Sequence, residues 1–185
     1  MTTGVGRTGS WFGFQHYDLA PDVVALGKGI GNGYPVSLAL FSAAVITRLG
    51  GRPVMYAQSH QNDPLGAAVA REVVRVIREE KLIERSRDIA WLLTQGLAGI
   101  QARTGQIREI RSRGLMVAVE LEDDPGASRT VWTHRELVRR GFVVGWRPGV
   151  SVLRFVPALT IDRGDIEQFL EAFEEVLTES TEGGQ

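Results

Sequence analysis

The stretch Ala25-Leu26-Gly27-Lys28-Gly29-Ile30-Gly31-Asn32-Gly33-Tyr34-Pro35 places a single lysine among glycines and apolar residues. No acidic side chain lies within five positions of Lys28 on either side. Burial in such surroundings disfavours the ammonium form, so this lysine is predicted to lose its proton near neutral pH and attack a carbonyl. We therefore expect Lys28 to be a covalent amine. The alternative is a loop lysine whose flanking glycines serve a turn.

The composition of the whole chain is that of an ordinary globular protein. It has 185 residues, of which 43% are hydrophobic and 23% charged. The formal net charge of -1 gives no overall basic field, so neither nucleic acid nor an anionic membrane is expected as a partner. We expect a cytoplasmic protein, because no apolar run approaches the roughly 18 residues of a membrane span and the amino terminus lacks a secretion signal.

The sequence offers few metal ligands. It contains no cysteine, which excludes disulfides and thiolate metal sites, and its histidines are the widely spaced His16, His60 and His134. No metal is therefore expected.

The first 78 residues resemble a piece of a larger α/β domain. Residues 1–35 are rich in glycine, with one short apolar segment from Val23 to Leu26. The elements predicted after them are a strand over 36–41, a helical turn over 43–49, a short strand over 54–57 and a long helix that starts at Asn62-Asp63-Pro64.

The second part, residues 79–185, is predicted to form a small α+β domain. A helix is expected from Leu82 to about Ala102, with Gly105 as its cap. The pattern then predicts strands over 107–113, 114–121, 142–146 and 152–156, helices over 128–140 and 161–177, and a frayed tail from 178. We expect the resulting small sheet to be covered on one face.

Four blocks occur in an order that indicates a family. They are Thr3-Gly4-Val5-Gly6-Arg7-Thr8-Gly9 with Phe12 and Phe14; Pro21-Asp22 leading to Leu26-Gly27-Lys28-Gly29; Asn62-Asp63-Pro64-Leu65; and Arg113-Gly114-Leu115-Met116 with Leu153-Arg154-Phe155-Val156-Pro157. On these blocks the chain resembles the carboxyl-terminal half of a class III (ornithine and 4-aminobutyrate type) aminotransferase, a fold-type I enzyme dependent on pyridoxal phosphate.

The resemblance implies a fold and an activity. Residues 1–78 would be the remnant of the fold-type I large domain, and residues 79–185 a complete small carboxyl-terminal α+β domain. The implied reaction moves an amino group between an amino acid or amine and a 2-oxo acid, in a homodimer or higher homo-oligomer.

The resemblance also assigns roles to particular residues. Lys28 matches the lysine that forms the Schiff base with pyridoxal phosphate and then shuttles the substrate's α-proton. Ser59 lies where the family carries a threonine that reaches the cofactor phosphate of the neighbouring subunit, with Gln61 as a rival. The alternative for this loop is capping and turn chemistry around Pro64.

Arg154 matches the arginine that binds a substrate carboxylate, and a guanidinium suits a carboxylate in two-point geometry. Its alternatives are a structural ion pair or a surface position. His16 and His60 are candidates to line the cofactor pocket, although a structural role is the better interpretation of both.

The chain also departs from the family pattern. An intact member is about twice as long, and an Asp-Glu-Val block, whose aspartate pairs with the pyridine nitrogen, precedes Thr-Gly-x-Gly-Arg. Met1 stands in the place of that valine. We therefore expect the chain alone to be weak or inactive. Three explanations remain open: a truncated gene or misplaced start, one half of a split enzyme with a separate amino-terminal half, or a non-catalytic oligomeric or partner-binding module.

Overall fold

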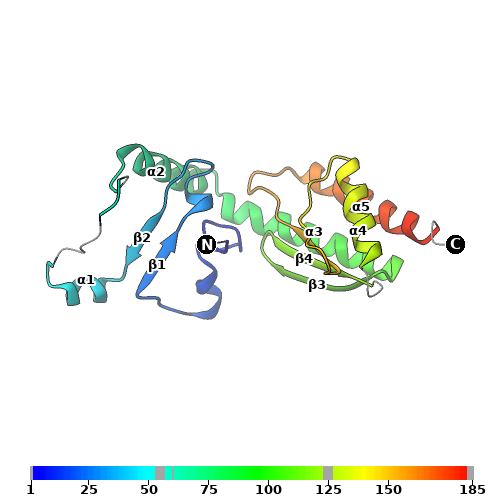
Figure 1. Cartoon of the computed structure of the whole chain (residues 1–185), viewed down its shortest axis with the longest axis horizontal. Coiled ribbons are helices and arrows are strands. Elements are labelled where there is room, and N and C mark those ends of the chain that lie inside the picture. The colour runs from blue at the N-terminus through cyan, green and yellow to red at the C-terminus, as the bar shows by residue number, and fades with distance from the viewer. Residues whose placement is uncertain (1, 53–56, 60, 123–126, 183–185) are drawn as a thin grey trace. The chain divides into compact units, whose positions relative to one another are not determined.

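A computed structural model describes residues 2–52, 57–59, 61–122 and 127–182 (Figure 1). The chain divides into two compact units, which we call unit 1 (Met1–Ile83) and unit 2 (Glu84–Gln185). The division falls five residues after the predicted boundary at residue 78.

Unit 1 consists of short elements followed by one long helix. In chain order they are the 3-10 helix η1 (Gly13–Tyr17), β1 (Val23–Leu26), the 3-10 helix η2 (Lys28–Ile30), β2 (Leu38–Phe41), α1 (Ala43–Leu49) and α2 (Pro64–Glu79). β1 and β2 pair antiparallel, with Leu26 opposite Leu38. α2 begins as predicted, because the Asp63 carboxylate accepts the backbone N–H groups of Leu65 and Gly66.

Unit 2 contains a three-stranded antiparallel sheet with helices around it. Its elements are α3 (Leu82–Thr104), which starts just before the unit boundary, β3 (Ile107–Arg113), β4 (Met116–Leu121), α4 (Ser128–Arg139), β5 (Val152–Phe155) and α5 (Arg163–Glu182). The strand order is β3-β4-β5. Gly105 has a φ of 64°, and its N–H donates to the Gln101 carbonyl, so it ends α3 as predicted.

The sheet of unit 2 has one buried face and one polar face. Along β4, Val117, Val119 and Leu121 are buried, whereas the residues between them are half-buried. The buried face belongs to one hydrophobic cluster that also takes side chains from α3, α4 and α5. The predicted coverage of one sheet face agrees with this pattern.

Three predictions of local structure are wrong or untested. Residues 142–146 form no strand: Gly145 makes a single bridge to Arg154, and Val143 is 94% exposed. A lone pair of backbone hydrogen bonds does not make a ladder. The tail predicted to fray from residue 178 continues α5 to Glu182. The predicted strand over 54–57 lies almost entirely outside the described residues.

Candidate functional site

Lys28 lies on a tight turn that directly follows β1. It is the first residue of η2, and its φ of 54° is in the left-handed region, which a residue with a Cβ rarely adopts. The Gly31 N–H donates to the Lys28 carbonyl at 2.9 Å. Two residues further on, Ile30 is buried and fixes the turn to the body of unit 1. The strained backbone at Lys28 marks this turn as a candidate site.

Lys28 was expected to be buried, but it is exposed in the part of the chain that the structure describes. Its side chain is exposed, because the glycines around it carry no side chains and its apolar neighbours Leu26 and Ile30 point into unit 1. The turn does rest on the glycine-rich amino-terminal loop, since a Cβ on Gly29 would meet Val5 at 3.6 Å. Lys28 is therefore an accessible primary amine. Lys81 is the other lysine of the chain, and it too is exposed with a left-handed φ of 51°.

Tyr34 links this turn to the amino terminus of α2. The sequence patterns did not predict this link. Its hydroxyl donates to Asp63 Oδ2 at 2.9 Å. That hydrogen bond, with a contribution from desolvation, raises the pKa of the Tyr34 phenol. Asp63 was predicted only as a helix cap, and nothing in the local pattern indicates a tyrosine 29 residues earlier as its partner.

Ser59 lies in the segment that leads into α2. It is exposed and belongs to a turn, and Gln61 N–H donates to the carbonyl of Gln58 at 3.1 Å. Ser59 and Lys28 therefore belong to the same unit. Their roles toward a cofactor stay predictions. His60 lies outside the described residues.

The glycine-rich amino-terminal loop places His16 and Thr8 together. His16 Nε2 lies 3.0 Å from the Thr8 carbonyl oxygen, which is a structural contact within the loop. The His16 side chain is otherwise exposed. The Thr8 hydroxyl is buried and has no hydrogen-bond partner among the described residues. The same loop borders a hollow of about 550 Å³ in unit 1. It is lined by Val5, Trp11, Phe12, Leu26, Ile30, Leu38, Leu40, Val74 and Arg78.

Arg154 belongs to β5 in unit 2 and lies on the polar face of its sheet. It pairs with Ala118, whose other neighbour is Arg111. Arg111 is bound to Glu120, whereas the Arg154 guanidinium has no ion pair or side-chain hydrogen bond within the part of the chain that the structure describes. A Cβ on Gly145 would lie 3.4 Å from both Cβ and Nε of Arg154. The missing side chain at Gly145 therefore leaves space for the guanidinium.

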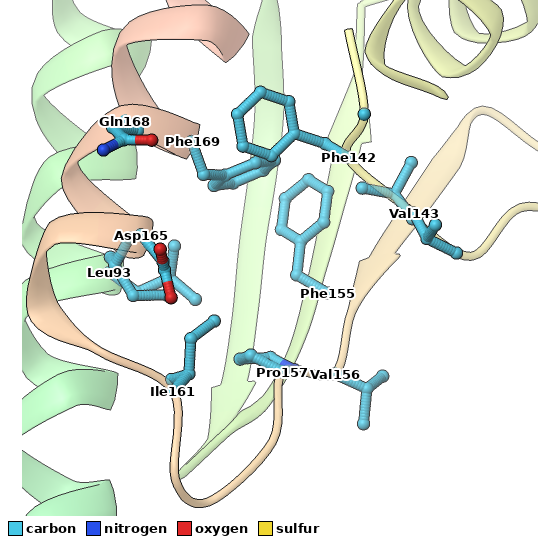
Figure 2. Close-up of a pocket in the computed structure, with 13 residues that line it drawn as sticks. Leu93, Phe142, Val143, Phe155, Val156, Pro157, Ile161, Asp165, Gln168 and Phe169 are labelled. Atoms are coloured by element: carbon cyan, nitrogen blue, oxygen red, sulfur yellow. The ribbon is translucent and has the colours of Figure 1, made fainter. Parts of the chain in front are cut away.

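A cavity of about 350 Å³ lies elsewhere in unit 2, between β5, the start of α5 and residues 141–144 (Figure 2). The rings of Phe142, Phe155 and Phe169 gather at one end of it. Phe155 and Phe169 pack edge to face, with 4.8 Å between their ring centroids. Asp165 and Gln168 supply its polar groups. None of the predicted site residues lines this cavity.

The described ranges hold no sign of a metal centre or a membrane span. They contain no group of three or more His, Cys, Asp or Glu side chains placed to bind a metal. Across the same residues, no helix combines the length and apolar character that crossing a membrane requires.

Comparisons with known proteins point to one family. The model of the aminotransferase class-III family matches residues 1–177. Ornithine aminotransferase 1 of Staphylococcus aureus (strain MRSA252) is 34% identical over 178 residues, which are 96% of this chain and 43% of that protein. The chain thus spans less than half the length of this curated relative.

Solved structures give the same result. Acetylornithine aminotransferase from Elizabethkingia anophelis is similar to 96% of this chain, over 44% of its own, with a TM-score of 0.85 and 27% identity. An amine transaminase from an uncultivated Pseudomonas species, in a PLP-bound (internal aldimine) form, covers 96% of this chain with 43% of its own, at a TM-score of 0.84 and 27% identity. The fold agrees with that of fold-type I transaminases, and the chain belongs to the class-III aminotransferase family.

Proposed function

We propose that this chain is the lysine-bearing, carboxyl-terminal part of a pyridoxal-phosphate-dependent aminotransferase. The reaction would move an amino group between an amino acid or amine and a 2-oxo acid. One observation carries the proposal: in a chain of this family, the lysine of the Gly-Lys-Gly block is an exposed amine on a strained turn that buried and hydrogen-bonded neighbours hold in place.

The residues of unit 1 fit pyridoxal phosphate by their donor chemistry. The cofactor carries an aldehyde, which suits the accessible amine of Lys28, and a phosphate, which suits the exposed hydroxyl of Ser59 as a hydrogen-bond donor. No acidic residue lies within five positions of Lys28 in the sequence, so no sequence neighbour can form an ion pair with its amine. When bound, the cofactor supplies an electron sink that weakens the bonds at the α-carbon of an amino substrate.

Each residue would then act through its own functional group. The free amine of Lys28 would take the proton from the substrate's α-carbon and return it. The Ser59 hydroxyl would donate to the phosphate held by a neighbouring subunit. Arg154 would bind a substrate carboxylate with two parallel N–H donors, and its lack of an acidic partner among the described residues supports this assignment.

We further propose that the chain acts with additional protein and transaminates weakly or not at all by itself. Unit 1 exposes large apolar side chains, and its hollow of about 550 Å³ is lined mainly by apolar residues. The exposed residues are Tyr17, Leu19, Val23, Leu40, Phe41, Ile46 and Leu65. A second copy of the chain or a separate amino-terminal half would cover this surface. The same observation favours the second candidate function, a non-catalytic module that binds a partner.

Covalent trapping separates these possibilities. The chain is incubated with pyridoxal phosphate and reduced with borohydride, and the labelled peptides are then identified. Lys81 serves as the internal control because it is the chain's other lysine and is also exposed. We expect cofactor on Lys28 in clear excess over Lys81, and its loss in Lys28→Arg. Equal labelling of both lysines would contradict the proposal for Lys28. Efficient turnover of an amino donor and a 2-oxo acid by the chain alone would contradict the proposal that it transaminates weakly or not at all by itself.

A further inference from the structure

We infer that Tyr34 is a positioning residue for Lys28, and that its hydrogen bond to Asp63 holds the lysine turn against the amino terminus of α2. The inference rests on the proposed function of Lys28. The Tyr34 hydroxyl donates to Asp63 Oδ2 at 2.9 Å. The same carboxylate accepts from Gly66 N–H at 3.0 Å and from Leu65 N–H at 3.1 Å. One side chain thus joins the turn to the first turn of a 16-residue helix.

A continuous series of backbone hydrogen bonds connects Tyr34 to Lys28. The Tyr34 N–H donates to the Gly31 carbonyl at 2.8 Å, and the Gly31 N–H donates to the Lys28 carbonyl at 2.9 Å. A Cβ on Gly31 would lie 2.1 Å from the Tyr34 carbonyl oxygen, so these segments pack too closely for any side chain there. Moving Tyr34 therefore moves the backbone that carries the amine.

The segment after Tyr34 also packs closely on the start of α2. A Cβ on Gly66 would meet Val36 Cγ2 at 3.1 Å and Asp63 Oδ2 at 3.2 Å, so the chain just after Tyr34 lies directly on the start of α2. Residues of η2 also contact α2. α2 is the longest element of unit 1, and it gives the turn a rigid support.

Lys28 needs such a support because its backbone conformation is strained. A left-handed φ at a residue with a side chain costs on the order of 1–3 kcal/mol and persists only where the surroundings hold it. Lys81 also has a left-handed φ and an exposed side chain, but its turn is closed differently: its own N–H donates to the Arg78 carbonyl at 3.3 Å, whereas the Lys28 carbonyl accepts from the Gly31 N–H at 2.9 Å. The two lysines therefore differ in how their turns are held.

The test compares Tyr34→Phe with Asp63→Asn in the full chain. Tyr34→Phe keeps the ring and removes the donor. Asp63→Asn leaves one side-chain oxygen, which can take the Oδ2 position and accept from Tyr34 and Gly66, whereas its amide nitrogen cannot accept from the Leu65 N–H. Asp63→Ala and the double variant Tyr34→Phe/Asp63→Ala complete a cycle. Two quantities are measured in each variant: the Lys28 to Lys81 labelling ratio after pyridoxal phosphate and borohydride, and the hydrogen exchange of the Gly31 and Tyr34 amides without cofactor.

We expect Tyr34→Phe to lower the labelling ratio about fivefold, the effect of one typical hydrogen bond. It should also speed exchange of both amides. Asp63→Asn should lower the ratio less than Tyr34→Phe, because it keeps an acceptor for the tyrosine while losing one cap hydrogen bond. The double variant should be no worse than Asp63→Ala. Unchanged labelling and exchange in Tyr34→Phe would overturn the inference. If the parent fails to favour Lys28, the proposed function fails, and amide exchange still decides whether the bond holds the turn.

Discussion

The two units differ in how much of their apolar surface they bury. In unit 2 one continuous cluster draws on α3, all three strands, α4 and α5, and Phe173, Leu97 and Val119 are fully buried. In unit 1 the buried apolar residues are few, and among the described residues none of the largest fully buried side chains comes from it. The unit that carries Lys28 is therefore the one with the weaker core. We therefore expect its order to depend more on local hydrogen bonds than on core packing.

The largest expected effect is the loss of a core side chain from unit 2. Phe173 is fully buried and stacks on Phe169 at 5.7 Å, so Phe173→Ala should lower the free energy of unfolding by about 3–5 kcal/mol. Leu26→Ala in unit 1 should cost about 2 kcal/mol, because Leu26 borders the hollow and already lacks contacts on one side. Urea unfolding measures both. A larger loss in Leu26→Ala than in Phe173→Ala would reverse the comparison.

The next effect concerns the turn that carries Lys28. Gly31→Ala should displace the turn, at a cost of about 1–3 kcal/mol, because its Cβ would lie 2.1 Å from a backbone oxygen. Gly29→Ala is the matched control, since its Cβ would only make ordinary contact with Val5 at 3.6 Å. The measurement is the labelling of Lys28 relative to Lys81. Similar ratios in the two variants would mean that the packing of the turn does not position the lysine.

Agreement between local sequence signals and tertiary pairing explains which predictions succeeded. The sheet and long helices of unit 2 follow from local signals, such as the alternation along β4 and the glycine that ends α3. The strand predicted over 142–146 failed because apolar character alone does not supply a pairing partner, and this segment bonds to β5 only at Gly145. Local patterns decide an element only where burial and pairing agree with them.

The candidate site was predictable in part. Motif order identified Lys28, Ser59 and Arg154 as candidates, but not the exposure of Lys28 or the space beside Arg154. The bond between Tyr34 and Asp63 joins residues 29 positions apart, and no periodicity links them. Contacts of this kind depend on the path of the chain, which single-sequence patterns do not encode.

A smaller effect is expected at Arg154. Gly145→Ala should push its guanidinium aside by a few tenths of an ångström and weaken carboxylate binding about two- to threefold, less than the loss of a full hydrogen bond. Gly164→Ala on α5 is the control, because a Cβ there would have no neighbouring atom within 4 Å. Titration with a dicarboxylic 2-oxo acid, followed through the Arg154 Nε–H resonance, measures the effect. An unmoved resonance in Gly145→Ala would show that Gly145 does not set the guanidinium position.

The smallest effect is a pH dependence confined to unit 2. Hydrogen bonds from Arg139, and then Arg140, lower the pKa of Glu136 from 4.5 to about 2. A carboxylate whose folded pKa is lowered stabilises the fold above pH 4.5, and this contribution is lost as the pH falls toward 2. Glu136→Gln should flatten the stability profile only slightly over that window, because the Arg139 and Arg140 side chains keep contact with solvent, which screens their ion pairs with Glu136. Urea midpoints at several pH values measure it, and an unchanged slope would show that Glu136 does not contribute.

Residue-resolved hydrogen exchange of the full chain, with and without pyridoxal phosphate, tests the difference between the units most directly. We predict slow exchange in β4 and α5 and, by comparison, faster exchange through β1, η2 and β2. Added cofactor should slow the amides around Lys28 and leave unit 2 unchanged. Equal protection of both units without cofactor would contradict the central claim that the lysine lies on the weakly packed unit.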